Sequence, residues 1–277
     1  MESSPPPKRT IFFVSDRTGI TSETLGQSLL TQFDVEFDQV TLPFVDNPER
    51  AKKAIEQINL TAQESQLRPV IFSTVVQDDV RNLLKTANAA FFDFFDQFIA
   101  PLELELGVKS SHAIGRSHGV GDRRVYDVRI NAMNYALSHD DGQTVRHYEK
   151  ADVVVVGVSR TGKTPVSIYL ALQYGIYAAN YPLTEDDLMD GRLPKFLQPF
   201  RDKLFGLTIQ PDRLQTIRQE RRPNSRYSSL AQCQVEIMRA EALFRKEKIP
   251  CVNSTTMSIE EMATTILQET RLRRRTF

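Results

Sequence analysis

The stretch D-V-V-V-V-G-V-S-R-T-G-K-T, residues 152–164, decides how the second half of the chain folds. Its four consecutive valines predict a strand buried on both faces, because β-branched side chains are stiff and pack well within a pleated sheet. The strand runs directly into the pattern G-x-x-x-x-G-K-T, and residues 165–174 then show a helical pattern. This order of strand, loop and helix is the context that a phosphate-binding loop requires.

Each residue type in this loop has its own use in holding a phosphate. Glycines let main-chain N–H groups converge on phosphate oxygens, the lysine reaches the terminal phosphates, and the threonine hydroxyl holds Mg²⁺. We expect Lys163 to be catalytic, since phosphoryl transfer depends on positioning and charge stabilisation, and Thr164 to be the metal ligand. The predicted nucleotide-binding residues are Gly157, Val158, Ser159, Arg160, Thr161, Gly162, Lys163 and Thr164. Arg160 is either a second cation for a phosphate oxygen or an outward-pointing arginine.

The bulk composition indicates a globular protein. Of 277 residues, 40% are hydrophobic and 25% charged, and 35 Lys and Arg balance 35 Asp and Glu. This balance argues against nucleic acid or an anionic membrane as the main partner. Cys233 and Cys251 have no metal-ligand spacing and are too few for a disulfide framework, which favours a reducing, cytoplasmic location. No apolar run approaches the ~20 residues needed to span a bilayer.

The first half of the chain alternates between expected strands and helices. The strands are expected at residues 10–15, 37–42 and 68–74, and the helices from residue 21 and at residues 48–60, 78–89 and 91–106. This alternation implies a Rossmann-like parallel sheet with helices on its faces. We interpret the aromatic run at residues 91–95 as core, and no internal repeat is apparent.

A polar, Gly-rich stretch at residues 108–124 precedes an expected helix at 125–138, which ends at the helix-stop signature H-D-D-G. We place the domain boundary near residues 143–150. The predicted parts are a disordered tail (1–9), an N-terminal α/β domain (10–145) and a C-terminal P-loop kinase-like α/β domain (146–277). The last should contain strands at 152–157, 176–181, 203–209 and 250–252, and helices at 165–174, 211–221, 227–248 and 258–267.

Phosphorylating a hydroxyl also needs a carboxylate or an imidazole that orients it. The first candidates are Asp140, shortly before the phosphate loop, and His118, in the Gly-rich stretch. His139, Asp141, His112 and Asp16 are further polar candidates, and each is more often a cap or a surface group than a catalyst.

The expected helix at residues 211–221 and the residue after it carry four arginines. Arginines three or four residues apart lie on one face of a helix. This face either closes over a nucleotide as a lid or is simply a solvated basic surface. The arginines are Arg213, Arg218, Arg221 and Arg222. Asp212, just after an expected strand, is a weak candidate for a second Mg²⁺ ligand.

Seven segments in order carry a family resemblance. They are V-S-D-R-T-G-I-T-S-E-T (14–24), T-L-P-F-V-D-N (41–47), A-L-S-H-D-D-G (136–142), G-V-S-R-T-G-K-T-P (157–165), A-N-Y-P (179–182), L-F-G-L-T (204–208) and I-P-C-V-N-S-T (249–255). Together they resemble the regulatory proteins of phosphoenolpyruvate synthase, relatives of the pyruvate, phosphate dikinase regulatory proteins. The resemblance covers essentially everything after the tail. Cys251 departs from the aromatic residue of many members, which affects packing rather than chemistry.

The resemblance implies a bifunctional enzyme. One activity would transfer the β-phosphoryl group of ADP to a threonine of the target enzyme and silence it. The other would remove that phosphate with inorganic phosphate and release pyrophosphate. By position, residues 157–164 would be the ADP-binding loop. The resemblance favours phosphoenolpyruvate synthase as target, with the dikinase as alternative, and suggests a homodimer.

Two other classes of protein stay open. A small-molecule P-loop kinase would share the phosphate loop and an arginine-bearing lid, but it would not explain the α/β half before residue 143. A nucleotide-sensing regulator would bind its target without modifying it.

Overall fold

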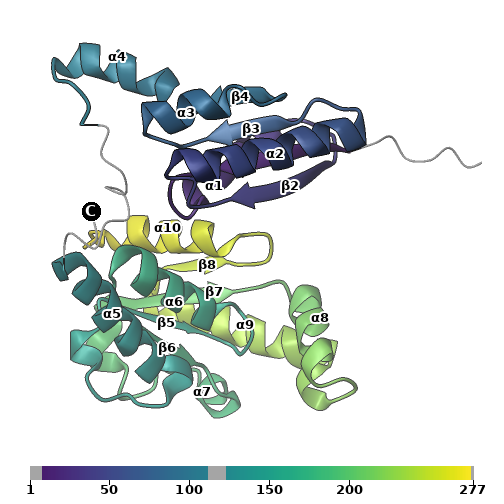
Figure 1. Ribbon diagram of the computed structural model, residues 1–277. Coiled ribbons are helices and arrows are strands. Elements are labelled where there is room, and N and C mark those ends of the chain that lie inside the picture. The colour runs from purple at the N-terminus through teal and green to yellow at the C-terminus, as the bar shows by residue number, and fades with distance from the viewer. Residues whose placement is uncertain (1–7, 112–122, 276–277) are drawn as a thin grey trace, which may run out of the picture. The chain divides into compact units, whose positions relative to one another are not determined.

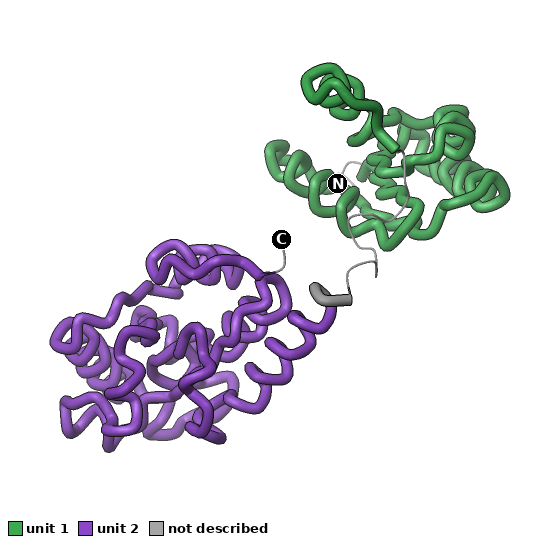
Figure 2. The backbone as a smooth tube through the Cα atoms, turned by 90° about the vertical axis from the view of Figure 1, so that its left-hand side faces the viewer, with its two compact units in different colours: residues 1–119 green, residues 120–277 purple. Residues whose placement is uncertain are grey.

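The computed structural model describes residues 8–111 and 123–275. The chain forms two compact units, Met1–Gly119 and Val120–Phe277 (Figure 2). Each unit contains its own four-stranded, all-parallel sheet flanked by helices. The predicted α/β class, with one parallel sheet in each half, is confirmed.

The first unit alternates strands and helices along the chain (Figure 1). Its elements are β1 (Arg9–Val14), α1 (Ile20–Leu30), β2 (Phe37–Leu42), α2 (Pro48–Ser65), β3 (Val70–Ser73), α3 (Asp78–Leu84), β4 (Ala90–Asp93) and α4 (Asp96–Leu106). The strand order is β2-β1-β3-β4. Side chains of β1 alternate between the faces: Phe12 packs in the cluster that contains α2 and α3 residues, and Phe13 lies against Gly26 of α1.

The single helix predicted at residues 91–106 is wrong in its first part. Residues 90–93 form β4, which pairs in parallel with β3 and places Phe92 opposite Phe72. The aromatic run suits a strand, because aromatic side chains favour a pleated surface. The prediction that this aromatic run lies in the core is confirmed only in part, because Phe94 is buried whereas Phe92 is 45% exposed.

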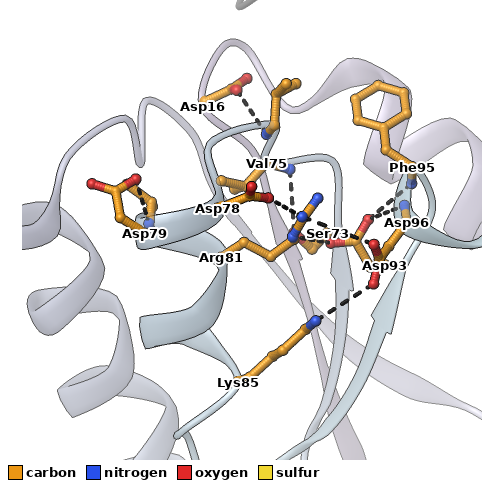
Figure 3. Close-up of polar contacts among 12 residues, drawn as sticks. Asp16, Ser73, Val75, Asp78, Asp79, Arg81, Lys85, Asp93, Phe95 and Asp96 are labelled. Carbon is orange, nitrogen blue, oxygen red and sulfur yellow. Dashed lines mark hydrogen bonds and ion pairs between the residues drawn. The ribbon is translucent and has the colours of Figure 1, made fainter. Parts of the chain in front are cut away.

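Buried polar side chains link the loops at the carboxyl edge of the first sheet (Figure 3). Asp16 accepts a hydrogen bond from the main-chain N–H of Val76 at 3.1 Å, which ties the loop after β1 to the loop after β3. Asp93 accepts from two main-chain N–H groups at the start of α4, at 2.9 and 2.8 Å. Burial raises the pKa of both carboxyl groups.

The second unit contains a longer series of elements. They are α5 (Arg123–Ser138), η1 (Asp140–Gly142), η2 (Tyr148–Lys150), β5 (Val153–Gly157), α6 (Lys163–Tyr174), β6 (Ala178–Pro182), α7 (Glu185–Asp190), η3 (Gln198–Lys203), β7 (Leu204–Thr208), α8 (Pro211–Arg221), η4 (Arg226–Ser228), α9 (Leu230–Glu247), β8 (Cys251–Asn253) and α10 (Ile259–Thr270). The strand order is β6-β5-β7-β8.

The valines of β5 are buried on both faces of this sheet, as the sequence predicts. Val153 and Val155 pack with apolar residues of α6 and α10, whereas Val154 and Val156 pack with apolar residues of α9. All four are fully buried. Strand β5, which leads to the predicted phosphate loop, therefore lies inside the core of the unit.

Helix α5 belongs to the second unit, so the chain divides at Gly119 rather than near residue 145. Ala132 and Ala136 of α5 pack against Ala171 of α6. Tyr135 stacks on Tyr177 with 5.0 Å between ring centroids. The polar stretch before α5, rather than the turn after it, therefore contains the boundary.

The two units repeat one topology, which we did not expect from the sequence. In both, the first strand lies between the second and the third, and the fourth lies beyond the third. In both, the first strand leads to the next helix, α1 or α6, through R-T-G-x-T, at residues 17–21 and 160–164. Gly19 and Gly162 have φ of 85° and 94° as the residues before these helices. The shared turn is five residues long, which is too short to reveal the common topology from the sequence alone.

Within residues 8–111 and 123–275, no helix has both the length and the apolar character that crossing a membrane would require.

Candidate phosphate-binding site

The loop between β5 and α6 makes a close turn over the end of the sheet. A Cβ atom at Gly157 would lie 2.4 Å from the carbonyl oxygen of Leu207 in β7, so only glycine fits there. Arg160 and Gly162 both have left-handed backbone conformations, with φ of 78° and 94°. Glycine adopts this conformation readily, but for Arg160 it costs conformational energy and persists only where the surroundings enforce it.

The surroundings that enforce this loop include a buried arginine. Arg218 of α8 is fully buried and donates to the carbonyl oxygen of Ser159 at 3.1 Å. It also forms an ion pair with Glu236 of α9 at 2.7 Å and lies over the ring of Tyr227 at 4.2 Å. The Tyr227 hydroxyl is itself 3.0 Å from the Ser159 hydroxyl. Arg218 is therefore a brace behind the loop, and the prediction that it belongs to a lid or a solvated face is wrong.

Lys163 is the first residue of α6 and is only 4% exposed. Its ammonium group donates to the main-chain carbonyl oxygen of Val158 at 2.9 Å. Burial lowers the pKa of Lys163 from 10.5 to about 8; the carboxylates of Asp141 and Asp140 oppose this shift, and the charge of Arg218 adds to it. A buried ammonium with so few partners would be stabilised by an anionic ligand, because burial without a counter-charge is unfavourable.

Asp140 lies directly beside the loop, as the sequence suggested it could. Its Oδ1 atom accepts from the Thr164 hydroxyl at 2.7 Å and from Nδ2 of Asn180 at 2.5 Å. Asn180 lies in β6 next to β5, and its Oδ1 atom accepts from the main-chain N–H of Asp141 at 2.9 Å. Three segments of the chain thus meet around one threonine hydroxyl.

A cavity of about 270 Å³ opens in front of the loop. It is lined by Asp141, Ser159, Arg160, Gly162, Lys163, Thr164, Pro165, Ile217 and Arg221. Three of these residues are cations and one is a carboxylate. A cavity with this lining suits a ligand that carries several phosphate oxygens.

The other predicted site residues lie elsewhere. His118 and His112 fall outside the described residues, so His118 stays a prediction. Asp16 lies in the first unit. Arg213, Arg222 and Asp212 are exposed and do not line the cavity. Of the four arginines in this region, Arg221 is the one that reaches it.

Sequence reasoning did not single out Asn180. The residue was visible only within the A-N-Y-P segment, at the carboxyl end of an expected strand. Its importance comes from two hydrogen bonds to residues about 40 positions earlier, which a local pattern cannot indicate.

The oxygen atoms near Thr164 suit Mg²⁺ better than a transition metal. Among the described residues, no group of three or more His, Cys, Asp or Glu could hold a metal ion. Mg²⁺ in phosphoryl-transfer sites is commonly held by one or two protein oxygens, water and phosphate oxygens rather than by a full protein cage. The Thr164 hydroxyl fits that pattern.

Comparisons with known proteins find a family and relatives that match nearly the whole chain. Residues 11–267 match the model of a family described as kinase/pyrophosphorylase. A protein of Alkalilimnicola ehrlichii is 63% identical over 270 residues, which cover 98% of each chain. A protein of Halorhodospira halophila is 59% identical over 268 residues (96% of this chain and 98% of the relative), and one of Pseudomonas putida is 53% identical over 269 residues (97% and 99%). All three are provisionally named phosphoenolpyruvate synthase regulatory proteins.

Proposed function

Because the chain belongs to the kinase/pyrophosphorylase family, we propose that it regulates phosphoenolpyruvate synthase by reversible phosphorylation. With ADP as donor it phosphorylates a threonine of the synthase and inactivates it. With inorganic phosphate it removes that group, releases pyrophosphate and restores activity. The observation that carries this proposal is the buried Lys163 at the start of α6, facing a cavity that Arg160 and Arg221 also line.

Both reactions fit a single site. In the kinase direction a bond forms between the threonine Oγ and the β-phosphorus of ADP, the bond to the bridging oxygen breaks, and AMP leaves. In the reverse direction an oxygen of inorganic phosphate attacks the same phosphorus, and the bond to the threonine Oγ breaks. Inorganic phosphate would then occupy the position from which AMP departs.

The roles of the loop residues follow from their positions. Main-chain N–H groups at the start of α6 and the ammonium of Lys163 would bind the phosphate oxygens, with Lys163 exchanging the Val158 carbonyl for one of them. Arg160 and Arg221 at the cavity would hold further oxygens. The Thr164 hydroxyl would hold Mg²⁺, which neutralises phosphate charge when bound.

A labelling experiment tests the proposal. ADP radiolabelled on its β-phosphate is incubated with this protein and purified phosphoenolpyruvate synthase, with and without excess inorganic phosphate. We expect label on the synthase, and its release as pyrophosphate when phosphate is added. Label on pyruvate, phosphate dikinase alone would identify the other target, label on a small molecule would indicate a P-loop kinase, and no label would indicate a sensor.

The Lys163→Ala variant tests the single site. We expect both reactions to slow by about 10²- to 10³-fold, because a preorganised charge at the transferred group is lost. Lys195→Ala, which removes an exposed lysine of the same unit, is the matched control and should keep both rates. Phosphorolysis at full rate in a Lys163→Ala variant without kinase activity would refute the single site.

A further inference from the structure

The second unit contains another cavity, which is separate from the one in front of the phosphate loop. Its volume is about 350 Å³, compared with about 270 Å³ for the cavity at the loop. It is lined by Arg192, Leu193, Gln198, Arg201, Lys246 and Glu247. None of these residues lines the cavity at the phosphate loop. We call this second cavity the amino-edge site.

The amino-edge site lies near the end of the sheet opposite the phosphate loop. Arg201 comes shortly before the first residue of β7, and Glu247 is the last residue of α9, shortly before β8 begins. The phosphate loop instead follows the last residue of β5. Because these strands are parallel, segments that precede a strand and segments that follow one lie at opposite edges of the sheet. A molecule in the amino-edge site would therefore not touch the phosphate loop.

The lining of the amino-edge site is rich in positive charge. Three of its residues are cations and one is a carboxylate, which is also the charge composition around the phosphate loop. The carboxylate is already engaged: Glu247 forms an ion pair with Arg201, and the Glu247 side chain is only 16% exposed. The site therefore has an excess of positive charge, and its one acid is not free to repel an anion.

The cations of the amino-edge site come from three segments and keep N–H groups for a ligand. Lys246 of α9 donates to the carbonyl oxygen of Gly191 at 2.6 Å, and Arg201 of η3 donates to the Glu247 carbonyl oxygen at 3.0 Å. These bonds fix where the two side chains lie but use only part of their donors. Arg192, between α7 and η3, is exposed and its side chain has no hydrogen bond or ion pair with any described residue. Charged donors thus converge on one cavity.

The size and lining of the amino-edge site define the class of ligand that it suits. Guanidinium groups bind carboxylates and phosphates through paired N–H groups, and an ammonium group adds a compact charge. Small-molecule sites usually have volumes of about 300–1,000 Å³, so this one lies at the small end of the range. Among the described residues around it, Leu193 is the one apolar side chain and none is aromatic, so a nucleotide base would find no stacking partner.

We propose that the amino-edge site binds a small metabolite that carries at least two phosphate or carboxylate groups. Arg192 and Arg201 would bind its acidic groups through their N–H groups, and Lys246 would add a third cation. The site binds this molecule without converting it, because its carboxylate is held by Arg201. The inference goes beyond the proposed function, since this ligand would be neither the donor nor the acceptor of the phosphoryl group.

Calorimetric titration of the full chain with phosphoenolpyruvate and, separately, with citrate tests the site. The first compound carries one phosphate and one carboxylate and the second carries three carboxylates, so the two titrations distinguish a phosphorylated ligand from a purely carboxylic one. We expect at least one of them to bind with a Kd below about 1 mM, the upper end of the usual range for metabolites. Arg192→Glu should weaken this binding by about 10- to 100-fold, because a charged hydrogen-bond donor is replaced by a repelling carboxylate. This variant should keep its circular dichroism spectrum, since the Arg192 side chain holds no other described residue.

Lys195→Glu is the matched control for Arg192→Glu. It makes the same change of charge at an exposed residue of the same segment that does not line the cavity. We expect it to change the affinity by less than about threefold, because water and salt screen an exposed charge that does not touch the ligand. Lys163→Ala shows whether the compound binds at the phosphate loop instead, and we expect it to leave the affinity for the compound unchanged.

Several results would overturn the assignment. Failure of both compounds to bind at about 1 mM would exclude a site of this class. Binding that Arg192→Glu leaves unchanged, or that Lys163→Ala abolishes, would place the compound elsewhere. Equal weakening by Arg192→Glu and Lys195→Glu would show a diffuse attraction to basic surface rather than a site. None of these outcomes depends on whether ADP labels the synthase, so the inference and the proposed function can fail separately.

Discussion

The two units of the molecule begin with the same strand order and the same R-T-G-x-T turn, yet their turns present different chemistry. At the residue after the turn glycine, the second unit has Lys163, which is 4% exposed, and the first has Ile20, which is 57% exposed. Two positions before the turn arginine, Val158 offers the lysine a carbonyl, whereas the equivalent Ser15 uses its hydroxyl to accept from the Arg17 N–H. Both parallel α/β units therefore contain the turn, and a buried lysine is found only at the turn of the second unit.

The helices after the fourth strands differ as well. Helix α10 buries Met262, Ala263, Ile266 and Leu267 in the second unit. Helix α4, at the same place in the first unit, buries no residue. Helix α10 therefore adds to the buried core of the second unit, whereas α4 adds no buried residue to the first unit.

The buried arginine behind the loop gives the largest expected difference in stability. In Arg218→Ala, Glu236 and two main-chain carbonyls lose their partner in the interior, which should lower the free energy of unfolding by about 3–5 kcal/mol. Amide hydrogen exchange should show the loss in β5 and α8, with peptides of the first unit as internal reference. A loss under about 1 kcal/mol would contradict a bracing role.

Arg81 of the first unit is the matched control for this prediction. It is also buried, but 3.8 Å separates its Nε atom from Asp93, and its other partners Asp78 and Asp96 are largely exposed. We expect Arg81→Ala to cost less than Arg218→Ala, because exposed carboxylates can turn to water. If Arg81→Ala lowered the free energy of unfolding as much as Arg218→Ala or more, the two buried arginines would not differ in their contribution to stability.

The buried ammonium of Lys163 predicts that the stability of the second unit depends on pH in the alkaline range. The pKa of Lys163 is 10.5 in the unfolded chain and about 8 in the folded protein. Between these two pH values the unfolded chain therefore binds more protons than the folded protein. The free energy of unfolding rises with pH in this range. This difference in pKa means that burying the Lys163 charge lowers the free energy of unfolding by about 3 kcal/mol. The full penalty applies below pH 8 and disappears above about pH 10.5.

Lys163→Met should therefore be more stable than the wild type by up to about 3 kcal/mol at pH 7 without nucleotide. The difference should shrink as pH rises through this window, as measured by urea unfolding followed by circular dichroism. Ile20→Met is the control and should show no such trend. A difference that is constant with pH would contradict the burial of a charged Lys163.

The close approach at Gly157 gives the smallest expected effect. Gly157→Ala places a Cβ atom 2.4 Å from the Leu207 carbonyl oxygen and should cost about 1–3 kcal/mol by overpacking. The equivalent Val14 of the first unit tolerates a side chain, so Val14→Ala should instead act by lost burial. Calorimetry should also show weaker ADP binding in Gly157→Ala; unchanged stability and affinity would show that the loop can move away without loss.

The parts of the fold that the sequence predicted have strong local signals. Four valines, a glycine-rich turn and a following helical pattern are all contained within residues 152–174, so the site's loop could be located without coordinates. The aromatic run at residues 91–95 misled the prediction because short apolar runs suit a strand and a helix equally, and only pairing with β3 decides between them. Helix α5 was assigned to the wrong side of the boundary because its packing on α6 leaves no local signal.

Local sequence alone determined the buried parallel strand and the glycine-containing turn of the candidate phosphate loop, because β-branched packing and glycine geometry act over a few residues. Tertiary structure decided which groups surround it. Thr164 and Asp140 are 24 positions apart, Asp140 and Asn180 are 40 apart, and Arg218 and Ser159 are 59 apart. Parallel strands joined by helices bring such distant residues to one edge of a sheet, and only that convergence distinguishes Asp140, which shapes the loop, from Asp141, which faces the cavity.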